Sequence, residues 1–540
     1  MKKIFLWIWI AGAGIHAVAQ APGNKKEKYN VVFFLVDDLG WQDVGFNGSK
    51  FYETPNLDRL AKEGVRFTDA YAACHVCSPS RASILTGKYP ARLQLSDWLP
   101  GRKNLPFQRL QNAPTRQFLS HEENTLAETL RDNGYRTAIF GKWHLGEDAD
   151  SSTPLQHGFQ ERMSEWNKGW PNKTYFSPYD LPGLEDGPEG EYLTDRLTTE
   201  AIQYIERNKD QPFFLYVSHF AVHDPIQGRP DLVEKYKKKL AAMKKAGGPP
   251  FILEGNPDNP HSPSRDRLNT FLNDPQYAGF SLLPNQTVKI KQQQDNIIFA
   301  AMVESMDESM GRILNKLKEL KLEEKTIILF VSDNGGMSAA NFGRPTRIID
   351  PAKLDEAFST SNLPLRAGKG WLYEGGIRVP MFIKWPGHAP KKSVSHTPVI
   401  TTDFYPTILD MLGLPLREKQ HVDGISLKPL LQGDHKIDRD AIYWHFPHYS
   451  NHGLQSPGGA IRSGDYKLLE YYENNTVQLF NLARDIGEQH DIAQVHPEIV
   501  KELRDKLHRW RASVGATMMP ANPQYSADSV AAPHLKPKGR

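Results

Sequence analysis

The stretch VVFFLVDD, residues 31–38, places two consecutive acids directly after six apolar residues. An apolar run without alternation is typical of a strand buried on both faces of a mainly parallel sheet. In open α/β sheets the ligand crevice lies outside the carboxyl ends of the strands. Residues 31–38 therefore predict a central strand, with Asp37 and Asp38 at the edge where a site would form.

The same arrangement recurs along the chain. Further short apolar runs occur at residues 137–140, 213–217, 327–331 and 379–383. Helical patterns separate the runs, for example at residues 55–63, 125–133, 193–208 and 297–320. Alternating strands and helices predict an α/β fold, in which a large, mixed but mostly parallel sheet is flanked by helices on both faces.

Polar and ionisable side chains follow most of these runs. They are Lys142, His144, His219, His223, Asp333 and Asn334. Because the carboxyl ends of parallel strands meet at one edge of a sheet, we expect these side chains to converge although they are far apart in the sequence.

The acids and amide at two of the strand ends suggest a cation site. Asp37, Asp38 and Asp333 offer carboxylates, and Asn334 offers an amide oxygen. Hard oxygen ligands suit Ca²⁺ or Mg²⁺ rather than zinc. Asp and Asn also favour turns, so either pair alone would be interpreted as capping a strand end. Because Asp37-Asp38 and Asp333-Asn334 both follow directly after a predicted strand, the cation site and the capping of strand ends both stay open as interpretations.

Length and composition limit the classes of protein. The chain has 540 residues, which predicts a large domain followed by a smaller one. Hydrophobic residues make up 39% and charged residues 24%, as in globular proteins, which excludes disorder across the chain. The formal net charge of +3 lacks the basic excess that nucleic-acid binding requires, so no nucleic-acid partner is expected.

The N-terminus has the layout of a secretory signal peptide. Lys2 and Lys3 precede an apolar run at residues 4–14, and residues 17–19 form a small-residue cleavage site. The competing interpretation is a membrane anchor, but the run is short for a bilayer span. We expect residues 1–19 to be removed, leaving a secreted or periplasmic protein without a membrane span.

Sequence texture divides the rest of the chain. Residues 20–435 carry the α/β pattern, interrupted at 226–295 by a polar segment that we interpret as an insertion or long loop near the site. Residues 436–540 form the predicted C-terminal subdomain, a small antiparallel sheet with a helix and then a mobile tail from Pro520. Its strand candidates lie at residues 441–446, 466–470 and 477–481, and its helical pattern lies at 497–512.

Cys74 and Cys77 are the only cysteines, so the chain cannot rely on a disulfide framework. Their C-x-x-C spacing suggests a thioredoxin-like redox pair. The residues that follow argue against this interpretation: residues 77–81 read CSPSR, and Thr86-Gly87 comes soon after. Redox chemistry does not require the residues after Cys77, Ser78-Pro79-Ser80-Arg81.

The segment CSPSR resembles the signature of the formylglycine-dependent sulfatases of the alkaline-phosphatase superfamily, in which C-x-P-S-R is followed closely by T-G. The chain looks most like the bacterial arylsulfatase A-like carbohydrate sulfatases. The resemblance covers nearly all of the chain after residue 19. It departs at Ala367, where many relatives have Gly. It includes Asp37-Asp38, GKWHLG at 141–146, His223 in AVHDP, SDNG at 332–335 and GKGWLYEGGIRVP at 368–380.

The resemblance implies the chemistry of the site. A separate sulfatase-maturating enzyme would convert Cys77 to formylglycine, whose hydrated form would attack sulfur. A covalent sulfo-enzyme would form, and the second hydroxyl would then expel sulfate, a step that a plain serine cannot make. One Ca²⁺, held by Asp37, Asp38, Cys77, Asp333 and Asn334, would act as a Lewis acid.

The resemblance also implies roles for the surrounding side chains. Arg81, Lys142 and Lys369 would stabilise charge on the sulfate oxygens. His144 would be the base in the elimination step, and His223 would be the acid that protonates the leaving oxygen. His223 matches the family's His-x-Pro position, which the neighbouring histidine at position 219 does not.

Sugar contacts are predicted from residue type. The segment 443–453 gathers aromatic, histidine and amide side chains, which suit sugar recognition. The alternative is a cluster at a domain interface, because Trp and Tyr favour interfaces. The candidate sugar contacts are Asp97, Trp98, His445, His448, Asn451, His452 and Arg462.

The leading hypothesis is an enzyme that removes an O-sulfate from a sulfated saccharide. A galactose or N-acetylgalactosamine sulfate is the preferred substrate, with position 4 as a first guess from the resemblance. One alternative is a phosphoesterase or phosphonate hydrolase of the same superfamily, which often binds two metals, whereas lysines stand here where a second metal would lie. The other is a non-catalytic glycan-binding protein, which the loss of Cys77, Lys142 or Lys369 would have favoured.

Overall fold

The structure is a computed structural model that describes residues 28–244, 247–259, 287–341, 349–453 and 455–526, together with Met1, Leu268, Thr270, Leu282 and Leu283. Apart from Met1, the expected signal peptide lies outside the described residues. Within the described ranges, none of the helices has the length and apolar composition of a membrane span.

An eight-stranded sheet forms the centre of the fold, in the order β12-β2-β11-β10-β1-β6-β4-β5. Each of the five apolar runs predicted as strands forms one, and the mostly parallel α/β fold is confirmed. The strands are β1 (Asn30–Val36), β2 (Val65–Phe67), β4 (Arg136–Gly141), β5 (Glu161–Arg162), β6 (Phe213–Ser218), β10 (Thr326–Ser332), β11 (Met381–Lys384) and β12 (Ser393–Ser395).

Strand β11 runs against its neighbours β10 and β2. Its first residue, Met381, pairs with Val331 near the carboxyl end of β10. The chain therefore stays at this edge of the sheet between β10 and β11, and the segment that carries Lys369 lies there before β11 runs back. The antiparallel strand is the consequence of keeping two chemically active segments at one edge.

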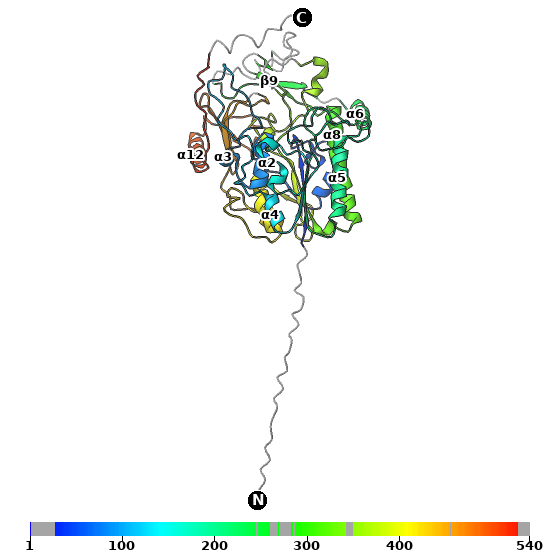
Figure 1. The fold of residues 1–540 in the computed structure, drawn as a ribbon. Coiled ribbons are helices and arrows are strands. Elements are labelled where there is room, and N and C mark those ends of the chain that lie inside the picture. Colours follow the sequence, from blue (N-terminus) through cyan, green and yellow to red (C-terminus); the bar gives the residue numbers. More distant parts are fainter. Residues whose placement is uncertain are drawn as a thin grey trace.

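Helices cover both faces of the sheet (Figure 1). Val32, Phe34 and Val36 of β1 pack on one face, and the alternate residues of the strand pack on the other. This explains the continuous apolar run, because burying each such side chain stabilises the fold by roughly 1.5–3 kcal/mol. One layer holds α1 (Pro55–Ala61), α5 (Leu193–Arg207), α6 (Pro230–Ala242) and α8 (Ile297–Glu319); the other holds α2 (Cys77–Thr86), α4 (Leu126–Asp132), α10 (Phe404–Met411) and α11 (Lys428–Leu431).

The C-terminal part is the predicted antiparallel sheet with a helix, α12 (Pro497–Ser513). Its strands are β14 (Ile442–Phe446), β15 (Gly458–Ser463), β16 (Tyr466–Tyr471) and β17 (Val477–Asn481). Strand β15 was not predicted, because its opening Gly458-Gly459 suggests a turn rather than a strand. An added Cβ at Gly458 would lie 2.8 Å from the carbonyl oxygen of Glu470, so this strand needs glycine for close pairing.

One hydrophobic cluster joins the C-terminal sheet to the segment that carries Lys369. It packs Trp371 and Tyr373 with Trp444 and Phe480. The division at residues 435 and 436 stays a prediction. The predicted mobile tail does not begin at Pro520. Asn522 donates its backbone N–H to Arg109 O (2.9 Å) and its side-chain amide to Gln108 O (2.8 Å), so the chain is anchored beyond Pro520.

The polar segment 226–295 is partly regular. It contributes α6, which packs on α8, and a small sheet of β7 (Phe251–Glu254), β8 (Leu282–Leu283) and β9 (Thr287–Lys291). The remaining short elements are β3 (Ala70–Tyr71) with β13 (Val399–Ile400), α3 (Pro90–Leu93), α9 (Glu374–Ile377) and 3₁₀ turns at 45–47, 148–150, 154–157, 323–325, 351–356 and 401–403.

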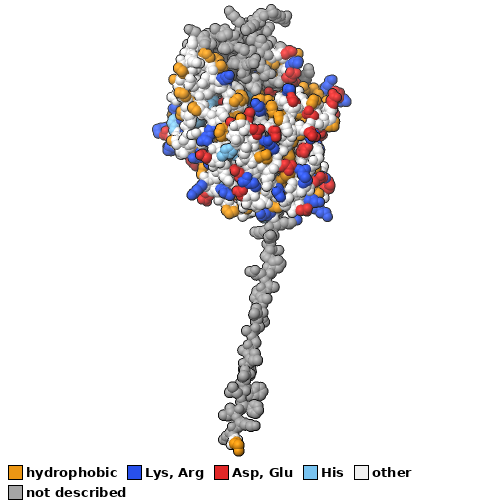
Figure 2. All heavy atoms as spheres, viewed as in Figure 1, with side chains coloured by type: hydrophobic (Ala, Val, Ile, Leu, Met, Phe, Trp, Pro, Cys, Tyr) orange, Lys and Arg blue, Asp and Glu red, His pale blue; other side chains and the backbone are white. Residues whose placement is uncertain are grey.

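Figure 2 shows acidic and basic side chains interspersed over one face of the molecule. On the described part of this face, no continuous basic stripe is visible. This distribution matches the near balance of 66 basic and 63 acidic residues in the chain.

Candidate active site

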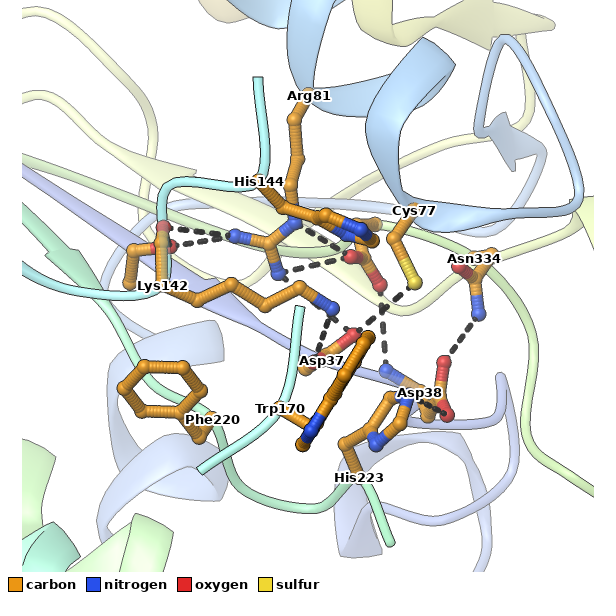
Figure 3. Close-up of polar contacts among 12 residues, drawn as sticks. Asp37, Asp38, Cys77, Arg81, Lys142, His144, Trp170, Phe220, His223 and Asn334 are labelled. Atoms are coloured by element: carbon orange, nitrogen blue, oxygen red, sulfur yellow. Dashed lines mark hydrogen bonds and ion pairs between the residues drawn. The ribbon is translucent and has the colours of Figure 1, made fainter. Parts of the chain in front are cut away.

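Helix α2 begins at Cys77, at the carboxyl edge of the central sheet, and presents Arg81 one turn later on the same face (Figure 3). Ser80 explains the local fold: its hydroxyl donates to Cys74 O (2.8 Å) and accepts from Cys74 N–H (3.2 Å). The helix ends at Gly87, whose φ of 70° favours glycine. The motif residues thus build a helix N-terminus that carries the cysteine into the site.

Three carboxylates and an amide surround Cys77. Asp37 and Asp38 follow β1, and Asp333 and Asn334 stand at the end of the adjacent parallel strand β10. The Cys77 Sγ lies 3.6 Å from Asp37 Oδ1. Ligand atoms lie within 4.8 Å of one another in two groups, Asp37–Cys77–Asp333 and Asp38–Cys77–His223.

Each carboxylate has a cationic partner. Lys142 Nζ lies 2.6 Å from Asp37 Oδ2, and Lys369 Nζ lies 2.7 Å from Asp38 Oδ2. Arg81 contacts Asp333 Oδ2 through Nε and Nη2, both at 2.8 Å. All six side chains are buried, so the pairing offsets the large cost of desolvating their charges.

Arg81 joins four strand ends. Its Nη1 donates to Lys142 O (3.2 Å) after β4 and to Ser218 Oγ (2.6 Å) on β6, while the rest of the guanidinium faces Asp333 and Asp37. The described wall of the cavity above Cys77 does not include Arg81. Its position is that of a group that holds the site together from below.

The donor set fits a hard divalent cation. The amide oxygen of Asn334 is buried and has no hydrogen-bond partner. Burial and the neighbouring Asp37 raise the pKa of Asp333 to about 6, which reflects the crowding of like charges. A cation bound by Asp37, Asp38, Asp333 and Asn334 would use the free oxygen and relieve this repulsion.

His144 lies beside Cys77 in its neutral form. Burial, together with Lys142, holds the pKa of His144 well below its usual value. Its Nε2 donates to Leu99 O (2.8 Å), and its Nδ1 has no partner, so one ring nitrogen offers a free lone pair. A Cβ at Gly169 would clash with the imidazole, so glycine lets the loop pack on this ring.

His223 is in the opposite electrostatic state. Burial and Lys369 disfavour its charged form, but Asp224, Asp38 and Asp37 outweigh them and raise the pKa of His223 above its usual value. Its Nδ1 lies 2.7 Å from Asp224 Oδ1. His219, by contrast, points to α8, where its Nε2 lies 2.9 Å from Ser309 Oγ.

A cavity of about 680 Å³ opens above these groups. Three of the candidate sugar contacts line it: Trp98, Asn451 and His452. Both ring nitrogens of His452 are buried and lack hydrogen-bond partners, so they are free to bind a ligand. Cys77, His144, His223 and Lys369 form part of the same wall.

The other four candidates face the protein rather than the described wall of the cavity. Asp97 accepts from Trp98 N–H (2.8 Å), and His448 Nε2 lies 2.8 Å from Ser96 Oγ. The remaining two are His445, bound to Tyr472 Oη (2.7 Å) and Thr517 O (2.9 Å), and Arg462, paired with Asp69 (2.7 Å). Their polar groups already have partners, which corrects the expectation that they face a sugar.

Several wall residues were not predicted. They are Trp170, Lys173, Asp224, Pro225, Ile226, Gln227, Asn341 and Glu356. Trp170 had a weak signal, because residues 166–170 read WNKGW and combine aromatic and polar side chains in a loop. Asp224 directly follows His223, but only the structure reveals that its backbone carbonyl accepts a hydrogen bond from His223 Nδ1 (2.7 Å) while its carboxylate lies close to the same nitrogen.

The C-terminal sheet holds the segment that carries Lys369. Lys467 on β16 donates to Glu374 Oε1 (2.9 Å) and Glu488 Oε1 (2.8 Å), and all three side chains are fully buried. Glu488 also accepts from the backbone N–H of Glu374 (2.6 Å). This network fixes the start of α9, five residues after Lys369.

Replacing Lys467 with methionine is expected to lower the free energy of unfolding by about 3–5 kcal/mol at pH 8, because it leaves the buried carboxylate of Glu488 without a cation. Glu374 loses one of its two cationic partners and keeps Arg378, whose Nε lies 2.7 Å from Glu374 Oε2. Burial and Glu374 already raise the pKa of Glu488 to about 7. A raised carboxyl pKa costs stability above that pKa, so the deficit should shrink as the pH falls toward 6. Urea unfolding at both pH values measures it.

The matched control is Lys501→Met, whose ion pair with Asp505 is on the surface of α12 and should leave the free energy of unfolding nearly unchanged. Adding Glu488→Gln to Lys467→Met should recover part of the loss. Equal unfolding free energies for Lys467→Met and the wild type at pH 8 would contradict the role of this network.

Comparisons with known proteins agree with the geometry. The family described as Sulfatase matches residues 29–414, and that described as N-sulphoglucosamine sulphohydrolase, C-terminal, matches residues 367–513. A protein named Sulfatase from Formosa agariphila is 30% identical, covering 92% of this chain and 90% of that protein. The N-acetylgalactosamine-6-sulfatase of Homo sapiens is 28% identical, covering 98% and 92% respectively.

A solved structure extends the likeness to three dimensions. The crystal structure of Ps i-CgsB in complex with k-i-k-neocarrahexaose superposes with a TM-score of 0.67 at 27% identity, covering 90% of this chain and 93% of that one. The family match spans more than half of the chain and includes Cys77 with its surrounding acids and cations. The chain therefore belongs to the sulfatase family of the alkaline-phosphatase superfamily.

Proposed function

We propose that this sulfatase removes an O-sulfate from a galactose-configured sugar of a glycan fragment, using formylglycine made from Cys77 and a bound Ca²⁺. The observation that carries the proposal is the position of Cys77. It lies at the N-terminus of α2, 3.6 Å from Asp37, on the wall of a cavity that also holds aromatic and polar side chains. A helix N-terminus is itself favourable for an anion such as sulfate.

The state of the thiol supports the need for modification. Burial raises the pKa of Cys77 to about 12, so an unmodified thiol would stay neutral and react poorly at physiological pH. Formylglycine supplies, in its hydrated form, an oxygen nucleophile and a second hydroxyl through which sulfate can be expelled. Cys74 is also buried and takes no part in this proposal.

The residues proposed to hold Ca²⁺ are Asp37, Asp38, Asp333 and Asn334, together with the modified side chain of residue 77. When bound, the cation supplies Lewis-acid polarisation of the sulfate group. Lys142 and Lys369 would stabilise charge on the sulfate oxygens. Arg81 positions the carboxylate of Asp333 and the strand ends around it.

His144 is proposed as the base that accepts a proton from residue 77 during the release of sulfate. Its low pKa keeps it neutral, and its Nδ1 is free while Nε2–H is held by Leu99 O. Its backbone N–H donates to Asn167 O (3.0 Å), which further fixes its orientation. A base must have a free lone pair within the site, and this ring meets that requirement.

His223 is proposed as the acid that protonates the leaving sugar oxygen. Its raised pKa favours the protonated form, and it lines the cavity beside Lys369. Asp224 orients the imidazole through the contact at Nδ1 (2.7 Å), which leaves Nε2 for the substrate.

Replacing His223 with alanine is expected to lower kcat/KM on sugar sulfates by about 10²–10⁴-fold, because a sugar alkoxide is a poor leaving group. Activated aryl sulfates should lose no more than about tenfold, since their leaving groups need no proton. The wild-type rate on sugar sulfates should fall as the pH rises through the pKa of His223, and the variant should lack this limb. Equal losses on both substrate types would contradict the acid role.

Trp98, Asn451 and His452 are the proposed sugar contacts, because an aromatic face and unpaired polar groups suit a pyranose. The galactose configuration, with the sulfate on position 4 or 6, rests on the relatives: one is an N-acetylgalactosamine-6-sulfatase, and one solved structure holds k-i-k-neocarrahexaose. The signal sequence supports export to the periplasm or beyond, and Cys77 implies a maturating enzyme as a partner.

The test is the mass of the tryptic peptide 67–81 from protein made in its native host, followed by assays on the 4- and 6-sulfates of galactose and N-acetylgalactosamine. We expect the mass of formylglycine at position 77 and release of sulfate from one of these sugars. Modified protein that cleaves phosphate esters faster than every sulfate ester would overturn the proposal.

A further inference from the structure

A second, smaller cavity of about 270 Å³ lies beside the one above Cys77. The two share two wall residues, His144 and Trp170, which both belong to the site shown in Figure 3. At a share of ~30 Å³ per molecule, the smaller cavity has room for about nine waters, which is comparable to one pyranose ring. The two cavities therefore adjoin at His144 and Trp170.

The polar group best placed to bind a ligand in this second cavity is Asn167. Asn167 lines the cavity and is only 6% exposed, and its amide oxygen is buried and has no hydrogen-bond partner. A buried amide without a partner costs free energy that a ligand hydroxyl would recover. The backbone carbonyl of Asn167 also accepts the N–H of His144 (3.0 Å), so Asn167 is held next to a residue that lines both cavities.

Apolar surfaces complete the wall. Trp170 and Pro100 line the cavity, and the loop before Trp170 is held by the indole of Trp166, which donates to Trp170 O (2.5 Å). Aromatic rings and proline suit the C–H face of a sugar, while amides suit its hydroxyls. This combination of side chains matches a carbohydrate better than a fully apolar or fully charged ligand.

The charges around the second cavity differ from those near Cys77. Glu147 and Asp150 line it, with Lys168 as the only lysine or arginine among its described wall residues. Lys168 already lies 3.4 Å from Glu147. The cavity above Cys77 is lined by two lysines, Lys369 and Lys173, together with two acids, Asp224 and Glu356, so it lacks the acidic excess of the second cavity. The second cavity therefore disfavours a sulfate or a carboxylate.

We infer that the second cavity binds the sugar adjacent to the sulfated residue, and that this neighbour is uncharged. The inference rests on the proposed function and deepens it. The preferred substrate is thus a monosulfated disaccharide or a longer fragment, rather than a free sulfated monosaccharide. Asn167 binds a hydroxyl of the neighbour, and Glu147 and Asp150 repel a sulfate on it.

The test uses whichever of the 4- and 6-sulfates of galactose and N-acetylgalactosamine the enzyme turns over. It compares three substrates that contain this sugar sulfate: the monosaccharide, a disaccharide with an unsulfated neighbouring hexose, and the same disaccharide with one sulfate on that neighbour. We expect kcat/KM to be highest for the disaccharide with the unsulfated neighbour. Asn167→Ala should lower the disaccharide-to-monosaccharide ratio of kcat/KM by about tenfold, the worth of one hydrogen bond. The double variant Glu147→Gln, Asp150→Asn should raise kcat/KM on the disulfated disaccharide, relative to the monosulfated one, by several-fold. An effect of this size is what screened surface charges provide.

Glu122→Gln is the matched control, because this exposed acid lies outside the described walls of both cavities. Melting temperatures of all variants separate folding defects from binding defects. If the monosaccharide and disaccharide are cleaved equally well, and Asn167→Ala leaves their ratio unchanged, the inference is wrong while the proposed function stands. If modified protein releases sulfate from none of these sugars, the proposed function fails and takes the inference with it.

Discussion

Replacing Cys77 with serine is expected to abolish steady-state turnover of sulfated sugars, by at least about four orders of magnitude. Serine can accept a sulfo group, but it has no second hydroxyl through which to expel sulfate, so the reaction stops after one event. The fold should not change, because the side chain is small and begins a helix that Ser80 and Gly87 define. Mass spectrometry of the variant after exposure to substrate would reveal the trapped sulfated serine.

Cys74→Ser is the matched control, since it changes the other buried cysteine three residues away. It should retain activity, provided that its melting temperature matches that of the wild type. Full activity of Cys77→Ser, or equal loss in both variants, would remove Cys77 from its proposed role. The second outcome would instead favour a function that depends on the pair of thiols.

Removing the divalent cation with a chelator is expected to lower activity by about 10³-fold and to lower the melting temperature. Asp37, Asp38 and Asp333 would then stay crowded with only their lysine and arginine partners, and the free oxygen of Asn334 would have no ligand. Added Ca²⁺ should restore both properties, and isothermal titration should detect one site per chain.

The variant Asp38→Ala should lose the calorimetric signal, because it removes one of the proposed oxygen ligands. Asp410→Asn is its control: this acid pairs with Lys428 on the partly exposed side of α10 and should leave the signal unchanged. Calcium binding that survives in Asp38→Ala would move the cation elsewhere. Chelation without effect on either activity or melting would show that no exchangeable cation matters.

Strand ends could be predicted from local sequence because a strand buried on both faces has a simple signature. Residues 31–36 and 327–331 are uninterrupted apolar runs, and the acids after them could not continue inside the core. Because ligands bind at the carboxyl edge of such a sheet, the sequence alone predicts that Asp37, Asp333 and Lys142 lie together. Strand β15 was not predicted, because Gly458-Gly459 has no local strand preference and is held in the sheet only by pairing with β14 and β16.

Sugar contacts were harder to predict, because residue type does not reveal which way a side chain points. His445 and His452 have the same chemistry and lie seven residues apart, yet one is bonded to Tyr472 and the other lines the cavity with both nitrogens free. Trp170 and Asp224 depend on loops whose paths are determined by distant contacts.

By itself, the sequence determined the α/β fold, the family and the set of groups at the sheet edge, since these depend on periodicity and on a short motif read along one segment. Only the tertiary structure decided which polar groups are already paired and which are free. The structure shows that Arg81 bonds to the ends of several strands and that Lys467 forms a buried network with Glu374 and Glu488, near Lys369. It also shows the second cavity, which Asn167 lines. The physical reason is that hydrogen-bond satisfaction and cavity shape are sums over neighbours far apart in the chain, which no local pattern encodes.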